Sequence, residues 1–250
     1  MAVETQTIVA LPAYNEEASL GMLLDAYAQL IREHPELHIK IIVVNDGSTD
    51  RTSQVLSEYS KILPLETVNH EQNRGLGQAI RTCLYEAIKR CRSDNDIIVS
   101  MDADNTHLPE YIPLLVEKIK SGADIVIASR FRQGSREIGV PFMRRVYSRG
   151  ARMLFALFLG LPGVRDYTCG YRAYRAGLIR KALEYYGDHI IARNGFACTD
   201  DLLVNLAIFT KKIAEIPFIL RYDNKIGKSK LPLFSTILET LKLLFHRKGK

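Results

Sequence analysis

Hydrophobic residues in this chain follow two patterns. Short uninterrupted apolar runs are typical of strands that are buried on both faces of a parallel sheet, and longer stretches with an apolar residue every three or four positions are typical of helices. The expected strands are residues 8–11, 39–44, 65–68, 97–101 and 123–128. The expected helices are residues 20–31, 52–61, 73–90, 110–120, 144–159, 178–183 and 200–208.

Strands and helices alternate along most of the chain. This order predicts an α/β fold with a mostly parallel, Rossmann-like sheet and helices on both faces. The first strand is expected to stop at Pro12, and residues 213–220 are expected to form an edge strand because they contain Pro217. Ligands of such sheets bind beyond the carboxyl ends of the strands. Polar residues follow four of the expected strands: Asn15, Asp46, Asp102 and Arg130.

Asp102 and Asp104, with Ala103 between them, directly follow the strand at residues 97–101. On an extended turn both carboxylates can reach one hard cation, and Mg²⁺ or Mn²⁺ is often held by one or two carboxylates together with the phosphates of a substrate. The alternative is a solvated loop in which an aspartate caps a helix. His107 is expected to form hydrogen bonds near this loop or to cap the next helix, with metal ligation as the alternative.

The composition is that of a globular protein, with 250 residues of which 47% are hydrophobic and 25% charged. A formal net charge of +6 favours anionic partners such as nucleotides or lipid phosphates. The cysteines form no C-x-x-C pair, which argues against structural zinc and against a disulfide framework. The sequence has neither a secretory signal nor an apolar run long enough for a transmembrane helix, so a cytoplasmic location is expected.

The expected helix at residues 144–159 begins with arginines and ends with leucines and phenylalanines. Such a surface can contact lipid head groups and their tails, although a core helix with a solvated first turn has the same pattern. A basic C-terminal tail, residues 231–250, contains a second amphipathic stretch at residues 233–245. Either segment offers a peripheral contact with the cytoplasmic face of a membrane.

Five stretches together resemble the inverting family-2 glycosyltransferases, and among them the dolichyl- or polyprenyl-phosphate mannose synthases. They are Leu11-Pro12-Ala13-Tyr14-Asn15-Glu16, Asn45-Asp46-Gly47-Ser48-Thr49-Asp50, Asp102-Ala103-Asp104 with His107 and Pro109-Glu110, Ser129-Arg130, and residues 166–172. The resemblance implies a GT-A fold. It implies one glycosyltransferase domain at residues 1–230, with a nucleotide-sugar half (1–130) and an acceptor half (131–230).

The resemblance also implies roles for individual residues. Asp102 and Asp104 would hold Mg²⁺ or Mn²⁺ against the diphosphate of a GDP- or UDP-hexose, with Ala103 beside the substrate. The nucleoside would be held by Pro12, Tyr14, Glu16 and Asp46. The phosphates of the acceptor or donor would be bound by Arg130, Arg144 and Ser148, and by two lysines on a closing loop, Lys228 and Lys230.

Several residues depart from the family pattern, among them Cys198, Thr199 and Asp201, which stand where a glutamine and a glutamate are expected. Asn45 stands where an aspartate is common. Arg152 stands where an amide side chain helps to coordinate the metal, and because a guanidinium can neutralise a diphosphate but cannot ligate a cation, we expect weaker metal dependence. Asn224 stands where a phosphate-binding arginine is expected, and Arg221 is the candidate to replace it.

Glycosyl transfer leaves negative charge on the departing diphosphate, which a cation on Asp102 and Asp104 would stabilise. A sugar hydroxyl acceptor needs a base, for which Asp201 or Asp200 is the candidate, whereas a lipid monophosphate is already largely dianionic at neutral pH. The arginines between residues 130 and 152 favour the phosphate.

We therefore expect an enzyme that moves mannose or glucose from a nucleotide diphosphate sugar to polyprenyl phosphate with inversion. One alternative is an enzyme of the same fold with a sugar hydroxyl acceptor and Asp201 as the base. The other is a nucleotide-sugar-binding module without catalysis. No nucleic-acid partner is expected.

Overall fold

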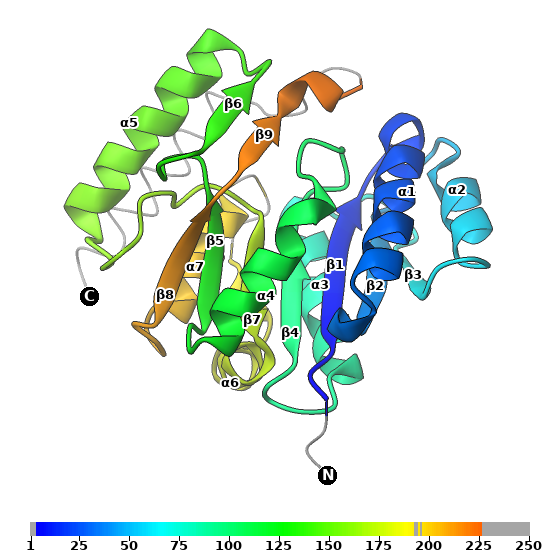
Figure 1. The fold of residues 1–250 in the computed structure, drawn as a ribbon, viewed down its shortest axis with the longest axis horizontal. Helices are drawn as coiled ribbons and strands as arrows, with labels where there is room; N and C mark the ends of the chain where they lie inside the picture. Colours follow the sequence, from blue (N-terminus) through cyan, green and yellow to red (C-terminus); the bar gives the residue numbers. More distant parts are fainter. Residues whose placement is uncertain (1–3, 193–194, 196, 227–250) are drawn as a thin grey trace.

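The computed structural model describes residues 4–192, 195 and 197–226, and its centre is a seven-stranded sheet in the order β3-β2-β1-β4-β7-β5-β8 (Figure 1). Every strand pair is parallel except the two pairs that β7 makes. The predicted α/β fold with a mostly parallel sheet is confirmed. The strands are β1 (Thr7–Ala13), β2 (Ile39–Asn45), β3 (Leu65–Asn69), β4 (Ile97–Ser100), β5 (Ile125–Ser129), β7 (Arg172–Arg175) and β8 (Ile213–Pro217).

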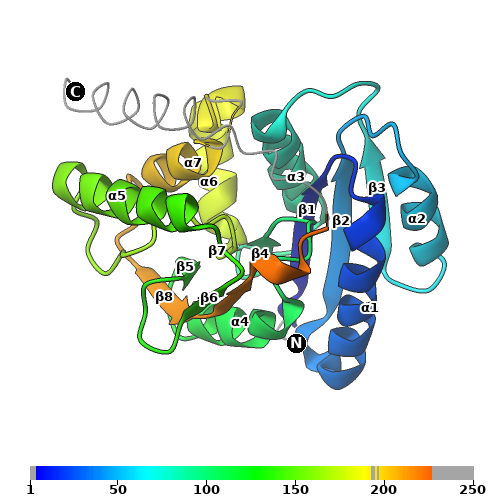
Figure 2. The ribbon, with the colours of Figure 1, turned by 90° about the horizontal axis from the view of Figure 1, so that it is seen from above.

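Helices cover both faces of the sheet, as the view from above shows (Figure 2). One face carries α1 (Glu17–Glu33) and α4 (Ile112–Lys120), and the other carries α3 (Leu76–Arg90), α6 (Ala176–Tyr186) and α7 (Cys198–Leu206). α2 (Thr52–Tyr59) packs beside α1 near the β3 edge. The central strands β1, β4 and β5 are buried along their whole length because helices lie above and below them.

Strand β1 continues through Pro12 to Ala13, so the expected stop at Pro12 is wrong. β4 pairs with β1 only as far as Ala10, while β2 pairs with β1 as far as Ala13. The main-chain oxygen of Ala13 accepts from the amide of Asp46 on the β2 side, so the nitrogen of Pro12 faces the side where β4 has already ended. A residue without an N–H is tolerated there because no ladder bond is lost.

The strands expected from the sequence do not include β7, which begins at Arg172 and lies antiparallel between β4 and β5. Arg172 is fully buried, and its guanidinium donates to the main-chain oxygens of Thr199 at 2.6 Å and Tyr167 at 2.5 Å. These bonds stabilise a charged residue in the interior. The main sheet therefore contains strands from both expected halves, residues 1–130 and 131–230, because β7 lies between β4 and β5.

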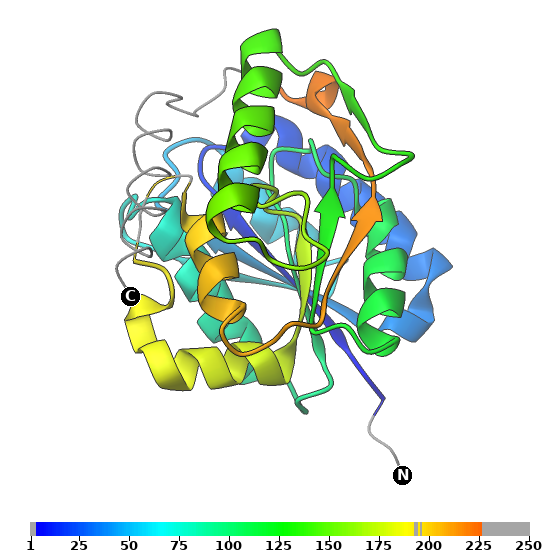
Figure 3. The ribbon, with the colours of Figure 1, turned by 90° about the vertical axis from the view of Figure 1, so that its left-hand side faces the viewer.

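A small parallel sheet of β6 (Arg136–Ile138) and β9 (Ile219–Arg221) lies beyond the carboxyl ends of β5 and β8 (Figure 1). The edge position expected for the strand with Pro217 is confirmed, because β8 ends the main sheet and β9 leaves it. Helix α5 (Phe142–Phe158) lies at the same end of the molecule, in front in Figure 3. Within the described part of the chain, none of the helices is long and apolar enough to span a bilayer. Short 3₁₀ helices are η1 (Pro35–Leu37), η2 (Pro109–Tyr111), η3 (Gly187–Ile190) and η4 (Tyr222–Asn224).

Candidate active site

The loop after β4 carries Asp102 and Asp104 at the carboxyl edge of the sheet. The Asp102 amide donates to Nδ1 of His107 at 3.4 Å, and Oδ1 of Asp104 accepts from the amide of Thr106 at 3.1 Å and from its hydroxyl at 2.6 Å. Asn105 has a φ of +61°, a left-handed conformation that asparagine adopts more readily than most residues. The loop is therefore folded back on itself, and the Asp102 side chain is 48% exposed.

His107 is buried beneath this loop, where its ring stacks on Tyr171 with centroids 5.3 Å apart and contacts the edge of Phe218. Burial lowers the pKa of His107, although the two aspartates act in the opposite direction. The hydrogen bond that Nδ1 accepts agrees with the first expectation for this residue. His107 supports the loop from below, and its Nδ1 lies 3.9 Å from Oδ2 of Asp102.

Lys225, just after η4, donates from its ammonium group to Oδ2 of Asp104. Both side chains are largely buried, with 13% and 15% exposed. Burial alone would raise the pKa of Asp104, but the charge of Lys225 and the hydrogen bonds from Lys225 and Thr106 outweigh it and hold this pKa below its ordinary value. Asp102 and Glu16 are also close enough to interact electrostatically with Lys225.

The segment that carries Lys225 is attached to the aspartate loop and to helix α5. The amide of Arg221 donates to the main-chain oxygen of Thr106 at 3.1 Å. Arg144, near the start of α5, donates to the hydroxyl of Tyr222 at 3.2 Å and lies over its ring at 4.9 Å. The charge of Arg144 acts on Asp102 as well. Arg144, Lys225 and the two aspartates thus form one charged cluster, which we name the aspartate cluster.

Two loops at the ends of β1 and β2 are tied together where the sequence predicts a nucleoside site. The amide of Asn15 donates to the hydroxyl of Ser48 at 3.0 Å, and the amide of Thr49 donates to Oδ1 of Asn15 at 2.8 Å. Glu16 accepts at 2.8 Å from the hydroxyl of Ser19, within its own helical turn. Pro12 is buried and Tyr14 is half-buried at this edge. The predicted residues Pro12, Tyr14 and Glu16 therefore come from one short segment.

Asp46 fixes the loop that follows β3. Its carboxylate accepts from Nδ1 of His70 at 2.6 Å and from the amides of Arg74 and Gly75 at 2.9 Å each. Asn45, the departure from the family pattern, donates to Ser53 and Asn69. Asn45 and Asp46 are both buried, and their hydrogen bonds to other residues of the protein hold the surrounding loops in position.

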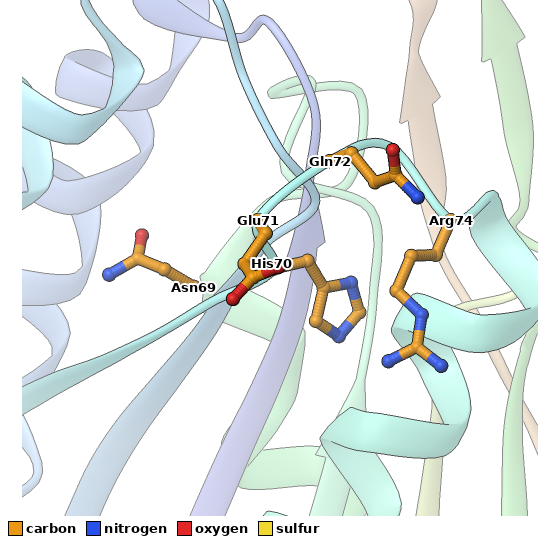
Figure 4. A pocket seen from close by; sticks show the side chains of 5 residues that line it. All are labelled: Asn69, His70, Glu71, Gln72 and Arg74. Atoms are coloured by element: carbon orange, nitrogen blue, oxygen red, sulfur yellow. The ribbon is translucent and has the colours of Figure 1, made fainter.

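A cavity of about 280 Å³ lies against this loop (Figure 4). It is lined by Asn69, His70, Glu71, Gln72 and Arg74. Carboxylate, amide and guanidinium groups together can both donate and accept hydrogen bonds. The cavity is large enough for a heterocyclic base, and its wall is held by the bonds of Asp46.

Arg130 and Ser148 form a second group around Asp166. Arg130 donates to both carboxylate oxygens of Asp166, to the hydroxyl of Ser148 at 3.1 Å and to that of Thr168 at 2.6 Å. This environment raises the pKa of Arg130 despite its burial, and it holds the pKa of Asp166 below its ordinary value although burial opposes this. Most of the N–H groups of Arg130 are thus bonded to the protein.

Three other predicted residues have side-chain contacts with partners outside the aspartate cluster. Arg152 lies over the ring of Phe131 at 4.9 Å, and the Arg221 side chain pairs with Asp223 at 2.9 Å. Asp201 is buried, and one of its oxygens accepts from the Ala192 amide at 2.8 Å. Lys228 and Lys230 lie outside the described residues.

The start of α7 nevertheless lies close to Asp102. A Cβ placed on Gly170 would be 3.5 Å from the methyl group of Thr199 and 3.7 Å from Oδ1 of Asp102. Asp200, the next residue of this helix, is buried, and burial raises its pKa to about 8 against the opposing charge of Arg172. The helix thus brings a carboxyl group of unusual pKa behind the aspartate loop.

The donor set suits a hard divalent cation. Among the residues that the structure describes, no group of three or more histidine, cysteine or acidic side chains is arranged to hold a metal. Two carboxylates remain, Asp102 and Asp104, and Mg²⁺ and Mn²⁺ are commonly held by such a pair together with substrate phosphates. Lys225 was missed by the sequence analysis. The neighbouring residue, Asn224, departs from the family pattern because an arginine is expected there. No sequence pattern, however, distinguishes Lys225 from the other lysines nearby.

Comparison with known proteins gives matches along most of the chain. The sequence model of "Glycosyl transferase family 2" matches residues 8–183. The dolichol-phosphate mannosyltransferase of Pyrococcus furiosus is 32% identical over 241 residues, which cover 95% of this chain and 62% of that protein. The polyprenol monophosphomannose synthase of Mycolicibacterium smegmatis is 30% identical over 228 residues, which cover 90% of this chain and 81% of that protein.

A similar fold occurs in the solved structure of glucosyl-3-phosphoglycerate synthase from Mycobacterium tuberculosis with Mn²⁺, uridine diphosphate and glucosyl-3-phosphoglycerate. The TM-score is 0.64 at 23% identity, over 97% of this chain and 80% of that one. The expected GT-A fold is thereby confirmed. The chain spans about three fifths of the length of the Pyrococcus relative and most of the mycobacterial proteins.

Proposed function

Because this chain belongs to glycosyl transferase family 2, we propose that it transfers a hexose, mannose or glucose, from a nucleotide diphosphate sugar to polyprenyl phosphate with inversion. By their names, the Pyrococcus relative is a mannosyltransferase that acts on dolichol phosphate, and the Mycolicibacterium relative makes polyprenol monophosphomannose. A third relative, from Micrococcus luteus, is named undecaprenyl-phosphate mannosyltransferase and is 31% identical over 90% of this chain.

The aspartate cluster is the observation that carries this proposal. Two carboxylates lie at the carboxyl edge of the sheet with Lys225 and Arg144 beside them. Acids that hold a cation and bases that hold phosphates are both needed to bind a sugar diphosphate. The tied loops with Pro12, Tyr14 and Glu16 and the cavity beside Asp46 lie along the same edge, where the nucleoside would bind.

Asp102 and Asp104 would hold Mg²⁺ or Mn²⁺ as cofactor. The half-exposed carboxylate of Asp102 and the oxygens of Asp104 are the hard donors that these cations prefer. The cation supplies positive charge for the diphosphate as it departs.

In the reaction, a phosphate oxygen of the acceptor forms a bond to the anomeric carbon while the bond from that carbon to the donor diphosphate breaks. Attack from the side opposite the leaving group inverts the anomeric centre. The acceptor is already anionic, so the protein has to position it rather than deprotonate it. Arg144 and the remaining N–H of the Arg130 guanidinium would orient the acceptor. Ser148 would help to hold Arg130 in place, since its hydroxyl accepts a hydrogen bond from that guanidinium.

A sugar hydroxyl acceptor is the second candidate. It would need a base, and Asp201 is buried with one oxygen already bonded to the Ala192 amide. Arg144 at the aspartate cluster favours the phosphate acceptor instead.

Helix α5 supports a peripheral contact with the membrane that carries the lipid acceptor. Its apolar residues Phe142, Met143, Val146, Met153 and Leu157 are all exposed, by 44% to 80%. Met143, Val146, Met153 and Leu157 recur at helical spacing and share one face, and arginines stand beside them. An apolar face flanked by arginines binds anionic lipid surfaces.

Transfer is tested with radiolabelled GDP-mannose, GDP-glucose and UDP-glucose, each with polyprenyl phosphate, with unphosphorylated polyprenol or with free sugars. We expect label in the organic phase with polyprenyl phosphate only, and a β-linkage by NMR when an α-linked donor is used. Label in a neutral oligosaccharide would instead support the hydroxyl acceptor. Binding of nucleotide without transfer to any acceptor would indicate a module without catalysis.

A further inference from the structure

The contact between Lys225 and Asp104 has a chemical consequence for the cation site. Oδ1 of Asp104 is bonded twice to Thr106, and Oδ2 is bonded to the ammonium group of Lys225. A divalent cation needs a lone pair of a carboxylate oxygen, and positive charges that are close together repel each other. The oxygen of Asp104 that points away from its own loop therefore already has a cationic partner.

The position of Lys225 is fixed from several sides. The Arg221 amide is bonded to Thr106 of the aspartate loop, and Tyr222 is held by Arg144. A Cβ at Gly139 would lie 2.7 Å from the main-chain nitrogen of Asp223, so β6 packs directly against this turn. The acids around the ammonium group are Asp104, Asp102 and Glu16. The lysine thus brings positive charge to an acidic site, and its pair with Asp104 is mostly shielded from water.

We propose that Lys225 and the divalent cation compete for Asp104, and that the donor diphosphate decides the competition by drawing the ammonium group to itself. This inference rests on the proposed function, since it needs an anionic diphosphate at the aspartate cluster. A diphosphate that binds Lys225 frees Oδ2 of Asp104 for the cation. Because coupling between two ligands is reciprocal, the cation in turn strengthens nucleotide binding by the same factor.

The test measures Mn²⁺ binding to the whole protein by electron paramagnetic resonance, without any transfer reaction. We expect Lys225→Met to bind Mn²⁺ about tenfold more tightly than the wild type when no nucleotide is present, since a partly buried competing charge is worth about that factor. Lys225→Arg keeps the charge and is expected to bind Mn²⁺ as weakly as the wild type. Lys61→Met, which removes an exposed lysine beyond α2, is the matched control and should leave Mn²⁺ affinity unchanged.

The second arm measures the coupling. GDP or UDP should raise the Mn²⁺ affinity of the wild type about tenfold or more, and this increase should be much smaller in Lys225→Met. Calorimetry with GDP compared with guanosine monophosphate, or with UDP compared with uridine monophosphate, should show that Lys225→Met loses preference for the diphosphate. A purely structural role for Lys225 would lower both affinities together and would not tighten Mn²⁺ binding.

Asp104→Asn combined with Lys225→Met completes the test. We expect the double variant to bind Mn²⁺ no better than Asp104→Asn alone, because the gain comes from freeing Asp104. Unchanged or weaker Mn²⁺ binding by a folded Lys225→Met protein would overturn the inference. If the competition is observed but no hexose is transferred to any acceptor, the proposed function fails and the inference about the cation site does not.

Discussion

Arg130 and Asp166 form a two-point ion pair in the interior, with N–O distances of 2.8 Å and 2.6 Å. Only 9% of the Arg130 side chain and none of the Asp166 side chain is exposed. The same carboxylate accepts from the amides of Arg130 and Cys169. The pair thus joins the end of β5 to the loop that leads into β7, and it holds Ser148 of α5 through the guanidinium of Arg130.

Asp166→Asn is expected to lower the free energy of unfolding by about 3–5 kcal/mol, because it leaves a buried guanidinium without its counter-charge. Urea unfolding followed by circular dichroism measures this change. Asp223→Asn, which breaks the more exposed pair with Arg221, is the control and should change stability little. Equal effects of the two substitutions would mean that the interior pair is not what joins these segments.

Asp102→Asn and Asp104→Asn are each expected to slow hexose transfer about 100-fold or more, because each removes one charge from the proposed cation site, where the cation would stabilise the departing diphosphate. The radiolabelled transfer assay measures the rate at saturating donor. Asp94→Asn is a matched control, since Asp94 lies before β4 at the opposite edge of the sheet. Undiminished transfer by either variant at the aspartate cluster would refute its role.

Stability should depend on pH through Asp200. Its pKa is raised to about 8 in the folded protein, mainly by burial, from an ordinary value of 3.8. Between these values the folded state keeps a proton that the unfolded state has lost, so this contribution to stability is complete below about pH 4 and is lost as the pH rises to about 8. Asp200→Asn removes the dependence and should be more stable than the wild type at pH 8, on the order of a few kcal/mol.

Unfolding curves of wild type and Asp200→Asn from pH 4 to pH 9 check this prediction. The difference between the two proteins should shrink toward pH 4. A difference that stays constant over the whole range would show that the substitution acts through packing and not through the proton.

Leu157→Glu should weaken binding to phosphatidylglycerol vesicles, because Leu157 is 80% exposed on the apolar face of α5. Co-sedimentation of the protein with vesicles measures it, and added salt should also weaken binding of the wild type. Ile62→Glu is the control, since Ile62 is 72% exposed but follows α2, away from α5. Equal losses in both variants, or binding that survives high salt, would contradict a contact through α5.

The main sheet was predictable because its parallel strands are continuous apolar runs, such as Ile97 to Val99. Such runs are typical of strands that are buried on both faces of a sheet. Strand β7 was not, because its sequence, Arg172-Ala173-Tyr174-Arg175, has charged ends. The burial of Arg172 depends on the oxygens of Tyr167 and Thr199 coming close to it, and nothing within the strand itself indicates those distant partners.

The candidate site shows the same division. Asp102 and Asp104 were predictable because they directly follow a strand, so that the fold alone positions them. Lys225 was not, because it reaches Asp104 across 121 positions of the chain, from a turn whose place depends on β6, β9 and α5. The sequence likewise predicts phosphate contact for Arg130 without any sign of Asp166, Ser148 and Thr168, which together accept from most of its guanidinium N–H groups.

The insertion of β7 between β4 and β5 also constrains how the polypeptide matures during translation. The partners of β5 are β7 and β8, both of which the ribosome makes later, and one side of β4 is completed only by β7. Until residue 175 has left the exit tunnel, a nascent chain has one side of β4 and both sides of β5 unpaired, and each of these edges is able to join another polypeptide. We therefore expect a nascent chain to need a chaperone most when synthesis pauses just before β7 has left the ribosome.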